Sequence, residues 1–157
     1  MTERRGLLPL IICVLIPIAV GGISSMLTRN AMMAFDSMNK PPLSPPGWLF
    51  PVAWTILYIL MGFASYMIYT SYSDMRSTAL IIYGVQLFFN FCWSIIFFRF
   101  EWYWLALIWL LIMWAMIICL VCITQSISKI AMFCLLPYLL WTTYAAYLNA
   151  GIAWLNR

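Results

Sequence analysis

Charged residues divide this chain into five long stretches that contain no charge. The stretches are Gly6–Leu27, Gly47–Tyr69, Thr78–Phe98, Trp104–Thr124 and Ile130–Trp154. At about 1.5 Å per residue, a helix of any of these lengths crosses the roughly 30 Å of hydrocarbon in a bilayer. None of them alternates polar and apolar residues as a membrane β-strand does, so the pattern predicts five transmembrane α-helices.

Composition places the whole chain in a membrane. Of its 157 residues, 66% are hydrophobic and 8% are charged, whereas a soluble domain is about half apolar and a quarter charged. The predicted fold class is therefore an all-α integral membrane protein, with residues 1–157 forming a single domain, a five-transmembrane-helix bundle. The connections are short except for residues 28–46, so consecutive helices should be antiparallel neighbours.

The first span and the membrane orientation each allow two interpretations. Arg4 and Arg5 precede the span, and small residues near its end would suit a cleaved signal peptide. Because four further spans follow and the apolar run is long, we expect the first span to be retained. Four basic residues fall on each side of the membrane: Arg4, Arg5, Arg76 and Lys129 on one, and Arg29, Lys40, Arg99 and Arg157 on the other. Because the two sides carry equal numbers of basic residues, the positive-inside rule does not predict the membrane orientation.

Few groups suit metal or acid–base chemistry. The chain has no histidine, and its five cysteines all lie inside the predicted spans. Cys119 and Cys122 form a C-x-x-C pair, but hydrocarbon strongly disfavours the thiolate that a metal or redox site needs. We interpret the cysteines as small buried hydrophobic residues and expect no metal site and no required cofactor. The sequence also shows no nucleophile–base pair and no carboxylate pair.

Three spans carry polar and aromatic residues on one helical face. In the third span, Gln86, Asn90, Trp93 and Phe97 are spaced by four, three and four residues. The matching residues elsewhere are Trp54 and Tyr58 in the second span, and Tyr138, Trp141, Ala145, Leu148 and Asn149 in the fifth. Amides in a span face the protein interior, where they either join helices or contact a ligand, and the two roles are compatible. Such faces turned inward would line an apolar pocket with flat aromatic walls, which suits a large planar ligand.

Four prolines stiffen the long connection between the first two spans: Pro41, Pro42, Pro45 and Pro46. Proline fixes its own φ and holds the preceding residue extended, so this loop should have low conformational entropy. We interpret it as a lid over one end of the bundle, with Arg29 and Lys40 adding positive charge at the mouth. The alternative is a solvated loop whose prolines have no role in binding.

Three segments, taken together, resemble one known family. They are NKPPLSPPGWLFPVAWTILYILMGFASY, QLFFNFCWSIIFF and LPYLLWTTYAAYLN. In this order, over roughly residues 31–156, they resemble the tryptophan-rich sensory protein/translocator protein family (TspO/MBR, the peripheral benzodiazepine receptor group). The resemblance implies a five-helix membrane bundle, usually homodimeric. It also implies binding of porphyrins such as protoporphyrin IX and, in some members, of sterols and isoquinoline or benzodiazepine drugs.

The resemblance also implies a ligand pocket beneath the first loop. Positions that match the family motifs are Trp54, Asn90, Trp93, Tyr138, Trp141, Ala145 and Leu148. Tyr58, Gln86 and Phe97 join this predicted set because they share the same helix faces. The expected lid and propionate contacts are Arg29, Phe35, Lys40, Pro41, Pro45 and Pro46. The lid departs from the family, because Ala34 and Phe35 stand where relatives often have a Trp-Tyr pair, and Leu43 where they often have Trp.

The leading hypothesis is a membrane receptor or regulator that binds tetrapyrroles and transports or senses them. One alternative is a light-dependent porphyrin-degrading enzyme that uses Trp54 and Trp141, as is proposed for some bacterial relatives. Another is a lipid- or sterol-binding transport protein, although the C-terminal sterol pattern of animal members is missing. The expected partners are the hydrophobic ligand, membrane lipid and a second copy of the chain, packed through Thr78, Ala79 and Gly84 of the third span. No nucleic acid is expected, and the expected location is a bacterial inner (cell) membrane.

Overall fold

Helices account for most of the chain in the computed structural model, which describes residues 5–35 and 38–156, except for the side chains of 30–34. The elements are α1 (Leu7–Phe35), α2 (Leu49–Tyr69), α3 (Arg76–Ser94), the π-helical turn η1 (Ile95–Arg99), α4 (Tyr103–Ile127) and α5 (Lys129–Leu155). Within the described residues there is no strand. Five helical segments, with η1 continuing α3, are long and apolar enough to cross a membrane. The predicted all-α, five-span membrane bundle is therefore confirmed.

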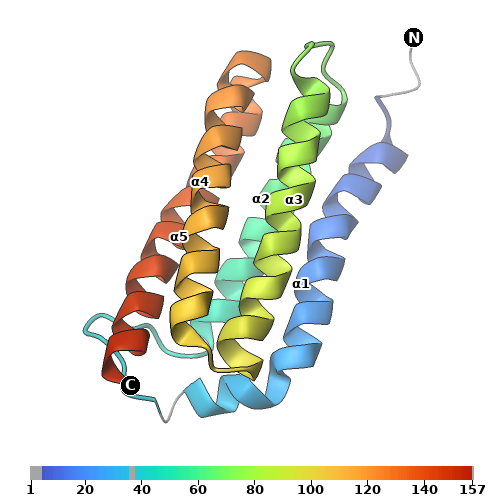
Figure 1. Ribbon diagram of the computed structural model, residues 1–157. Helices are drawn as coiled ribbons and strands as arrows, with labels where there is room; N and C mark the ends of the chain where they lie inside the picture. Colours follow the sequence, from blue (N-terminus) through green and yellow to red (C-terminus); the bar gives the residue numbers. More distant parts are fainter. Residues whose placement is uncertain (1–4, 36–37, 157) are drawn as a thin grey trace.

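The five spans close into a ring. Around it, α1 packs on α2, α2 on α5, α5 on α4, α4 on α3, and α3 with η1 back on α1. Consecutive helices run antiparallel, as predicted (Figure 1). The α2–α3 and α4–α5 connections lie at the end where the chain begins, whereas the lid, the α3–α4 turn and the C-terminus lie at the other end. Of the basic residues that the structure describes, Arg5, Arg76 and Lys129 therefore belong to one end of the bundle, and Arg29, Lys40 and Arg99 to the other.

The largest error in the predicted boundaries concerns the first helix. We expected it to end at Leu27 and a loop to occupy residues 28–46, but α1 continues to Phe35. Residues 28–35 contain neither proline nor glycine, so nothing in the sequence breaks the helix there. The lid is therefore confined to residues 36–48, of which 36 and 37 lie outside the described residues. The other helices begin and end within three residues of the predicted limits.

The third span changes its helical form near the lid end. Its backbone turns from α-helical to π-helical at Ile95, and the N–H of Phe100 donates to the carbonyl of Ile95 (3.1 Å). This wider turn leaves Phe97 buried in the bundle. It also puts Phe98 next to both Phe35 and Trp93, with ring centroids 6.4 and 6.2 Å away. π-helical turns within helices often mark functional sites, and this one lies beside the aromatic face that the sequence singled out.

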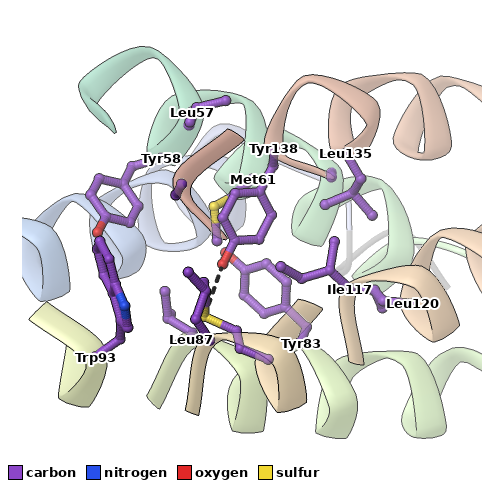
Figure 2. Packing of buried hydrophobic residues seen from close by; sticks show 14 of the residues in the cluster. Leu57, Tyr58, Met61, Tyr83, Leu87, Trp93, Ile117, Leu120, Leu135 and Tyr138 are labelled. Atoms are coloured by element: carbon purple, nitrogen blue, oxygen red, sulfur yellow. Dashed lines mark hydrogen bonds between the residues drawn. The ribbon is translucent and has the colours of Figure 1, made fainter. Parts of the chain in front are cut away.

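Glycine allows α1 and α2 to pack closely. A Cβ atom at Gly62 would lie 2.5 Å from the Cα of Val14 and 2.8 Å from the carbonyl oxygen of Cys13. Helices in lipid associate through such close packing, because lipid tails offer no hydrophobic gain over side chains. In the interior of the bundle, Tyr58, Met61 and Tyr138 belong to one continuous buried cluster, which also includes Leu120 and Leu135 (Figure 2).

The cysteines lie within the spans as free thiols. Cys119 and Cys122 are exposed on the outer face of α4, so our interpretation of them as buried residues was wrong. Both lie on the outward-facing side of α4, whose inward-facing side is occupied by larger apolar residues such as Leu120. Among the described residues, no three histidine, cysteine, aspartate or glutamate side chains gather as metal ligands do.

Candidate ligand-binding site

Trp54 of α2 is the centre of a group of aromatic side chains from three helices. Its ring centroid lies 5.5 Å from that of Tyr58, 6.2 Å from Tyr138, 6.3 Å from Trp93 and 6.4 Å from Trp141. We call these five residues the Trp54 cluster. The inward-facing surfaces of α2, α3 and α5 therefore meet, as their sequence spacing predicted.

A chain of hydrogen bonds connects two members of the Trp54 cluster, Tyr58 and Tyr138, to amide side chains of α3. The Tyr58 hydroxyl donates to Oδ1 of Asn90 (2.7 Å), and Nδ2 of Asn90 donates to the Tyr138 hydroxyl (3.2 Å). Tyr138 in turn donates to Oε1 of Gln86 (2.7 Å). All four side chains are buried, where a hydrogen bond satisfies groups that lipid cannot. Asn90 and Gln86 thus join α3 to α2 and α5, which is the helix-joining role that the sequence allowed.

Two buried donors in the site have no partner among the described residues. They are Nε2 of Gln86 and Nε1 of Trp141. By contrast, Nε1 of Trp93 donates to Oδ1 of Asn149 (3.1 Å), and Nδ2 of Asn149 donates to the backbone carbonyl of Tyr103 (2.8 Å). The Trp93 indole is therefore satisfied by a helix contact, whereas the Trp141 indole can still donate to a ligand acceptor.

The other predicted pocket residues lie around this centre. Phe97 is buried and stacks on Trp93, with centroids 5.5 Å apart, but its ring also contacts Tyr103 of α4 at 5.2 Å. It therefore extends the aromatic surface toward α4 and away from Trp54. Ala145 and Leu148 are buried on α5, along the side of the helix that carries Trp141.

Tyrosines of α5 hold the lid by its backbone. The Tyr144 hydroxyl donates to the carbonyl of Leu43 (2.6 Å), and the Tyr147 hydroxyl donates to that of Pro42 (2.7 Å). The Tyr144 ring also contacts Trp141, with centroids 5.7 Å apart. Sequence reasoning did not assign a role to either tyrosine. Their positions near the end of the fifth span, on the lid side of the membrane, were the available signal.

The start of the lid is fixed to the end of α5. Asn39 and Asn156 bond reciprocally: the N–H of Asn39 donates to Oδ1 of Asn156 (3.1 Å), whose Nδ2 donates to the carbonyl of Asn39 (2.8 Å). Pro41 is buried against Gly151, where a Cβ atom would come within 2.5 Å of the proline ring. Of the later prolines, Pro45 is half-buried and Pro46 is exposed just before α2.

The charged and aromatic lid residues differ in their placement. Phe35 is buried, with its ring 5.1 Å from that of Phe50, and Nζ of Lys40 lies 4.7 Å from the Phe35 ring centroid. Arg29 is exposed on α1 and is not part of the lid loop, because the helix continues beyond it. Leu43 is 85% exposed and points away from the bundle. The side chain of Ala34 lies outside the described residues.

A cavity of about 260 Å³ lies on one side of the Trp54 cluster. It is bounded by α1, α2 and the end of α3, and Trp54 and Tyr58 form part of its wall. On the other side, an open groove of about 400 Å³ runs between α2 and α5 and includes Trp141. Pockets for drug-sized ligands span about 300–1,000 Å³, so the cavity of about 260 Å³ is below that range.

Sequence reasoning gave the first predicted span, residues 6–27, no part in binding, yet this part of α1 supplies one wall of the cavity. The wall includes Gly21, Gly22, Ser24 and Ser25. In the sequence these small residues resembled a signal-peptide cleavage region. Their helical spacing with Thr28, which puts hydroxyl groups on one side of an apolar span, was the signal for a binding surface.

Comparison with known proteins agrees with this architecture. The TspO/MBR family model matches residues 13–155. A tryptophan-rich protein TspO of Chlorobaculum tepidum is 33% identical over 156 residues, which cover 98% of this chain and 99% of the relative. A protein of the same name in Archaeoglobus fulgidus is 33% identical, covering 96% and 99%. The translocator protein of Bos taurus is 31% identical, covering 86% and 82%. The chain therefore belongs to the TspO/MBR family.

Proposed function

We propose that the protein is a membrane receptor or regulator that binds porphyrins and related large planar ligands between α2, α3 and α5, beneath the lid. The observation that carries this proposal is the Trp54 cluster, in which rings from three helices surround one indole and the Trp141 N–H has no partner in the part of the chain that the structure describes. Stacking on such rings is worth about 0.5–1.5 kcal/mol per contact beyond the burial of area. An acceptor on the ligand would satisfy the Trp141 N–H.

Binding of a macrocycle requires the site to open. The rings of the Trp54 cluster contact one another, and the adjoining cavity of about 260 Å³ is too small for a porphyrin. Tyr144 connects the two parts that must move, because it contacts Trp141 and bonds to the lid at Leu43. Each lid hydrogen bond is worth about 0.5–1.5 kcal/mol, about as much as one aromatic contact with the ligand, so the ligand must gain at least as many such contacts as the lid bonds that it breaks.

The charged edge of a porphyrin defines its orientation in the proposed site. Propionates cannot enter hydrocarbon as anions without a large cost, so they should point to the lid end and toward water. Lys40, which lies over Phe35, is the basic lid residue nearest to the aromatic interior. Arg29 is on the same end of the bundle but exposed on α1, and its contribution should be smaller.

Absorption titrations with protoporphyrin IX test this proposal. Trp141→Ala should weaken binding equally at low and high salt, because stacking is not screened. Lys40→Ala should weaken it less, and that loss should shrink in high salt, since exposed charges are screened over about 8–10 Å. Trp154→Ala is the matched control, because this tryptophan is on the same helix but 63% exposed. If Trp141→Ala binds like the unmodified protein, the pocket is not where we propose.

Light-dependent porphyrin degradation is a second candidate function. Trp93 and Trp141 both contact Trp54, at 6.3 and 6.4 Å between centroids, so three oxidisable indoles would adjoin a bound macrocycle. The same titration mixture, kept in light and in darkness, separates the two functions. A shifted porphyrin band that is stable in light indicates binding alone, whereas bleaching to a new product only with protein and light indicates turnover.

We also propose a homodimer through α3 and a location in a bacterial inner membrane. Thr78 and Gly84 are exposed, and a Cβ atom at Gly84 would meet nothing within 4 Å. Ala79, which we had placed in the same patch, is buried inside the bundle, so that part of the prediction was wrong. Mass measurement in mild detergent tests the dimer, and a monomer at all concentrations would contradict it. Fractionation of the expressing cell tests the location.

A further inference from the structure

The cavity between α1, α2 and the end of α3 opens sideways, within the membrane. Gly22 and Ser25 of α1 and Pro51 and Thr55 of α2 are exposed and line it, so they form its mouth. All four lie in helical segments long and apolar enough to span the bilayer. A molecule dissolved in the bilayer therefore reaches this cavity between α1 and α2 without passing the lid.

Ser24 gives the cavity an unused hydrogen-bond donor. Its side chain is 4% exposed, and its Oγ has no partner among the described residues. Two other hydroxyls of the wall bond to backbone: Thr28 donates to the carbonyl of Ser24 (2.9 Å), and Thr55 donates to that of Pro51 (2.8 Å), whereas the hydroxyls of Ser25 and Ser94 are less buried than that of Ser24. Most buried polar groups in proteins have a partner, so an unpaired hydroxyl in the wall of a cavity points to a ligand that supplies the acceptor.

The opposite wall is aromatic, and the space is small. Gly21 lets the Tyr58 ring rest directly on α1, since a Cβ atom there would overlap the ring. Phe50 and Trp54 continue this wall on α2. A cavity of about 150 Å³ holds benzene, so the 260 Å³ here suit a molecule of roughly ten non-hydrogen atoms.

We propose that this cavity is a lateral binding site for compact aromatic or apolar molecules that carry one hydrogen-bond acceptor, such as a carbonyl, and that arrive from the bilayer. The aromatic wall of Trp54 and Tyr58 packs on the apolar part, and the Ser24 hydroxyl donates to the acceptor. This site adjoins the one proposed for porphyrins and shares Trp54 and Tyr58 with it, but Trp141 is not part of it. Neither proposal depends on the other.

A pair of probes with equal numbers of non-hydrogen atoms tests the role of the donor. Acetophenone carries a carbonyl, and α-methylstyrene has a methylene group in its place. Equilibrium dialysis of the protein in lipid nanodiscs, with empty nanodiscs as the blank, measures the binding of each. We expect saturable binding with a preference for the ketone. One hydrogen bond corresponds to roughly a two- to twelvefold difference in affinity.

Two variants locate the binding and identify the donor. Gly22→Leu should abolish binding of both probes, because a Cβ atom at this position meets nothing within 4 Å and the larger side chain fills the cavity. Ser24→Ala should remove only the preference for the ketone. This change deletes a buried unpaired hydroxyl, so the fold should not be weakened. Ser126→Ala is the matched control, since that hydroxyl is exposed on α4 and bonds to the Ile123 carbonyl.

Three results would overturn the proposal. No saturable binding above empty nanodiscs would show that the cavity takes no such molecule. Unchanged binding by Gly22→Leu would place the probe elsewhere. A ketone preference that persists in Ser24→Ala would exclude Ser24 as the donor.

Discussion

Replacing Tyr138 by phenylalanine should destabilise the bundle, although the ring remains. The Tyr138 hydroxyl is fully buried, donates to Gln86 and accepts from Asn90. Without it, Oε1 of Gln86 loses its partner on an amide whose Nε2 already has none. Nδ2 of Asn90 is also left unpaired. Losing a hydrogen bond between buried groups costs about 1–3 kcal/mol in soluble proteins, whereas interhelical bonds in membranes average about 0.6 kcal/mol and reach about 1.7.

Two such bonds give an expected loss of about 1–3 kcal/mol in the free energy of unfolding. Tyr83→Phe is a matched control in the same core. Tyr83 is a buried tyrosine whose hydroxyl has Ser65 as its nearest polar neighbour but makes no hydrogen bond of good geometry among the described residues. Removing that hydroxyl should be neutral or stabilising, because an unpaired buried polar group is itself unfavourable. Figure 2 shows both rings in the same part of the core.

Denaturation in mixed micelles, followed by circular dichroism, measures both variants against the unmodified protein. The expected order of stability is Tyr83→Phe equal to or above the unmodified protein, and Tyr138→Phe below it. Equal losses in the two variants would refute the reasoning, because the hydroxyls would then have the same value whether or not they are bonded. In an Asn90→Leu background, Tyr138→Phe should cost about half as much, because only the bond from Tyr138 to Gln86 then remains to be lost.

Three further predictions concern close contacts and the lid. Gly62→Ala should lower the free energy of unfolding by about 1–3 kcal/mol or more, because its Cβ atom would meet the backbone of Val14, which cannot rotate away. A neutral effect in the same denaturation assay would contradict this prediction. Gly151→Ala should displace Pro41 and raise amide hydrogen exchange over residues 38–48, with little change elsewhere. Unchanged exchange would show that the lid accommodates the added methyl group without detaching from α5. Tyr147→Phe removes one lid hydrogen bond, worth about 0.5–1.5 kcal/mol, and should raise lid exchange by a smaller factor than Gly151→Ala, measured by mass spectrometry.

Helix positions could be predicted closely from the sequence, because helix formation in a bilayer depends on each segment's own residues. A backbone group in lipid has no water to bond, so each apolar stretch must satisfy its own N–H and C=O groups. That is why four of the five predicted spans lie within three residues of the observed helices. The first helix was misjudged at its end for the complementary reason. Residues 28–35 are outside the apolar stretch but contain no helix breaker, so hydropathy alone gave the wrong boundary.

Helical spacing also indicated which residues face inward, but not what each one touches. The positions of Gln86, Asn90 and Trp93 on one face placed them inside the bundle, where the structure has them buried. Their partners come from other helices: Tyr58 is 32 residues from Asn90, and Tyr138 is 48 residues from it. No local pattern distinguishes the satisfied indole of Trp93 from the unpaired one of Trp141.

The sequence by itself determined a five-span membrane bundle, the ends to which its charges belong and the three helix faces that turn inward. Only the tertiary structure decided that α2 closes the ring against α5, that α5 holds the lid, and that α1 forms a cavity with Ser24 in its wall. The physical reason is the range of the forces involved. Transfer from water to lipid acts on each segment separately, whereas cavities, close approaches at glycine and side-chain hydrogen bonds depend on how several helices fit together.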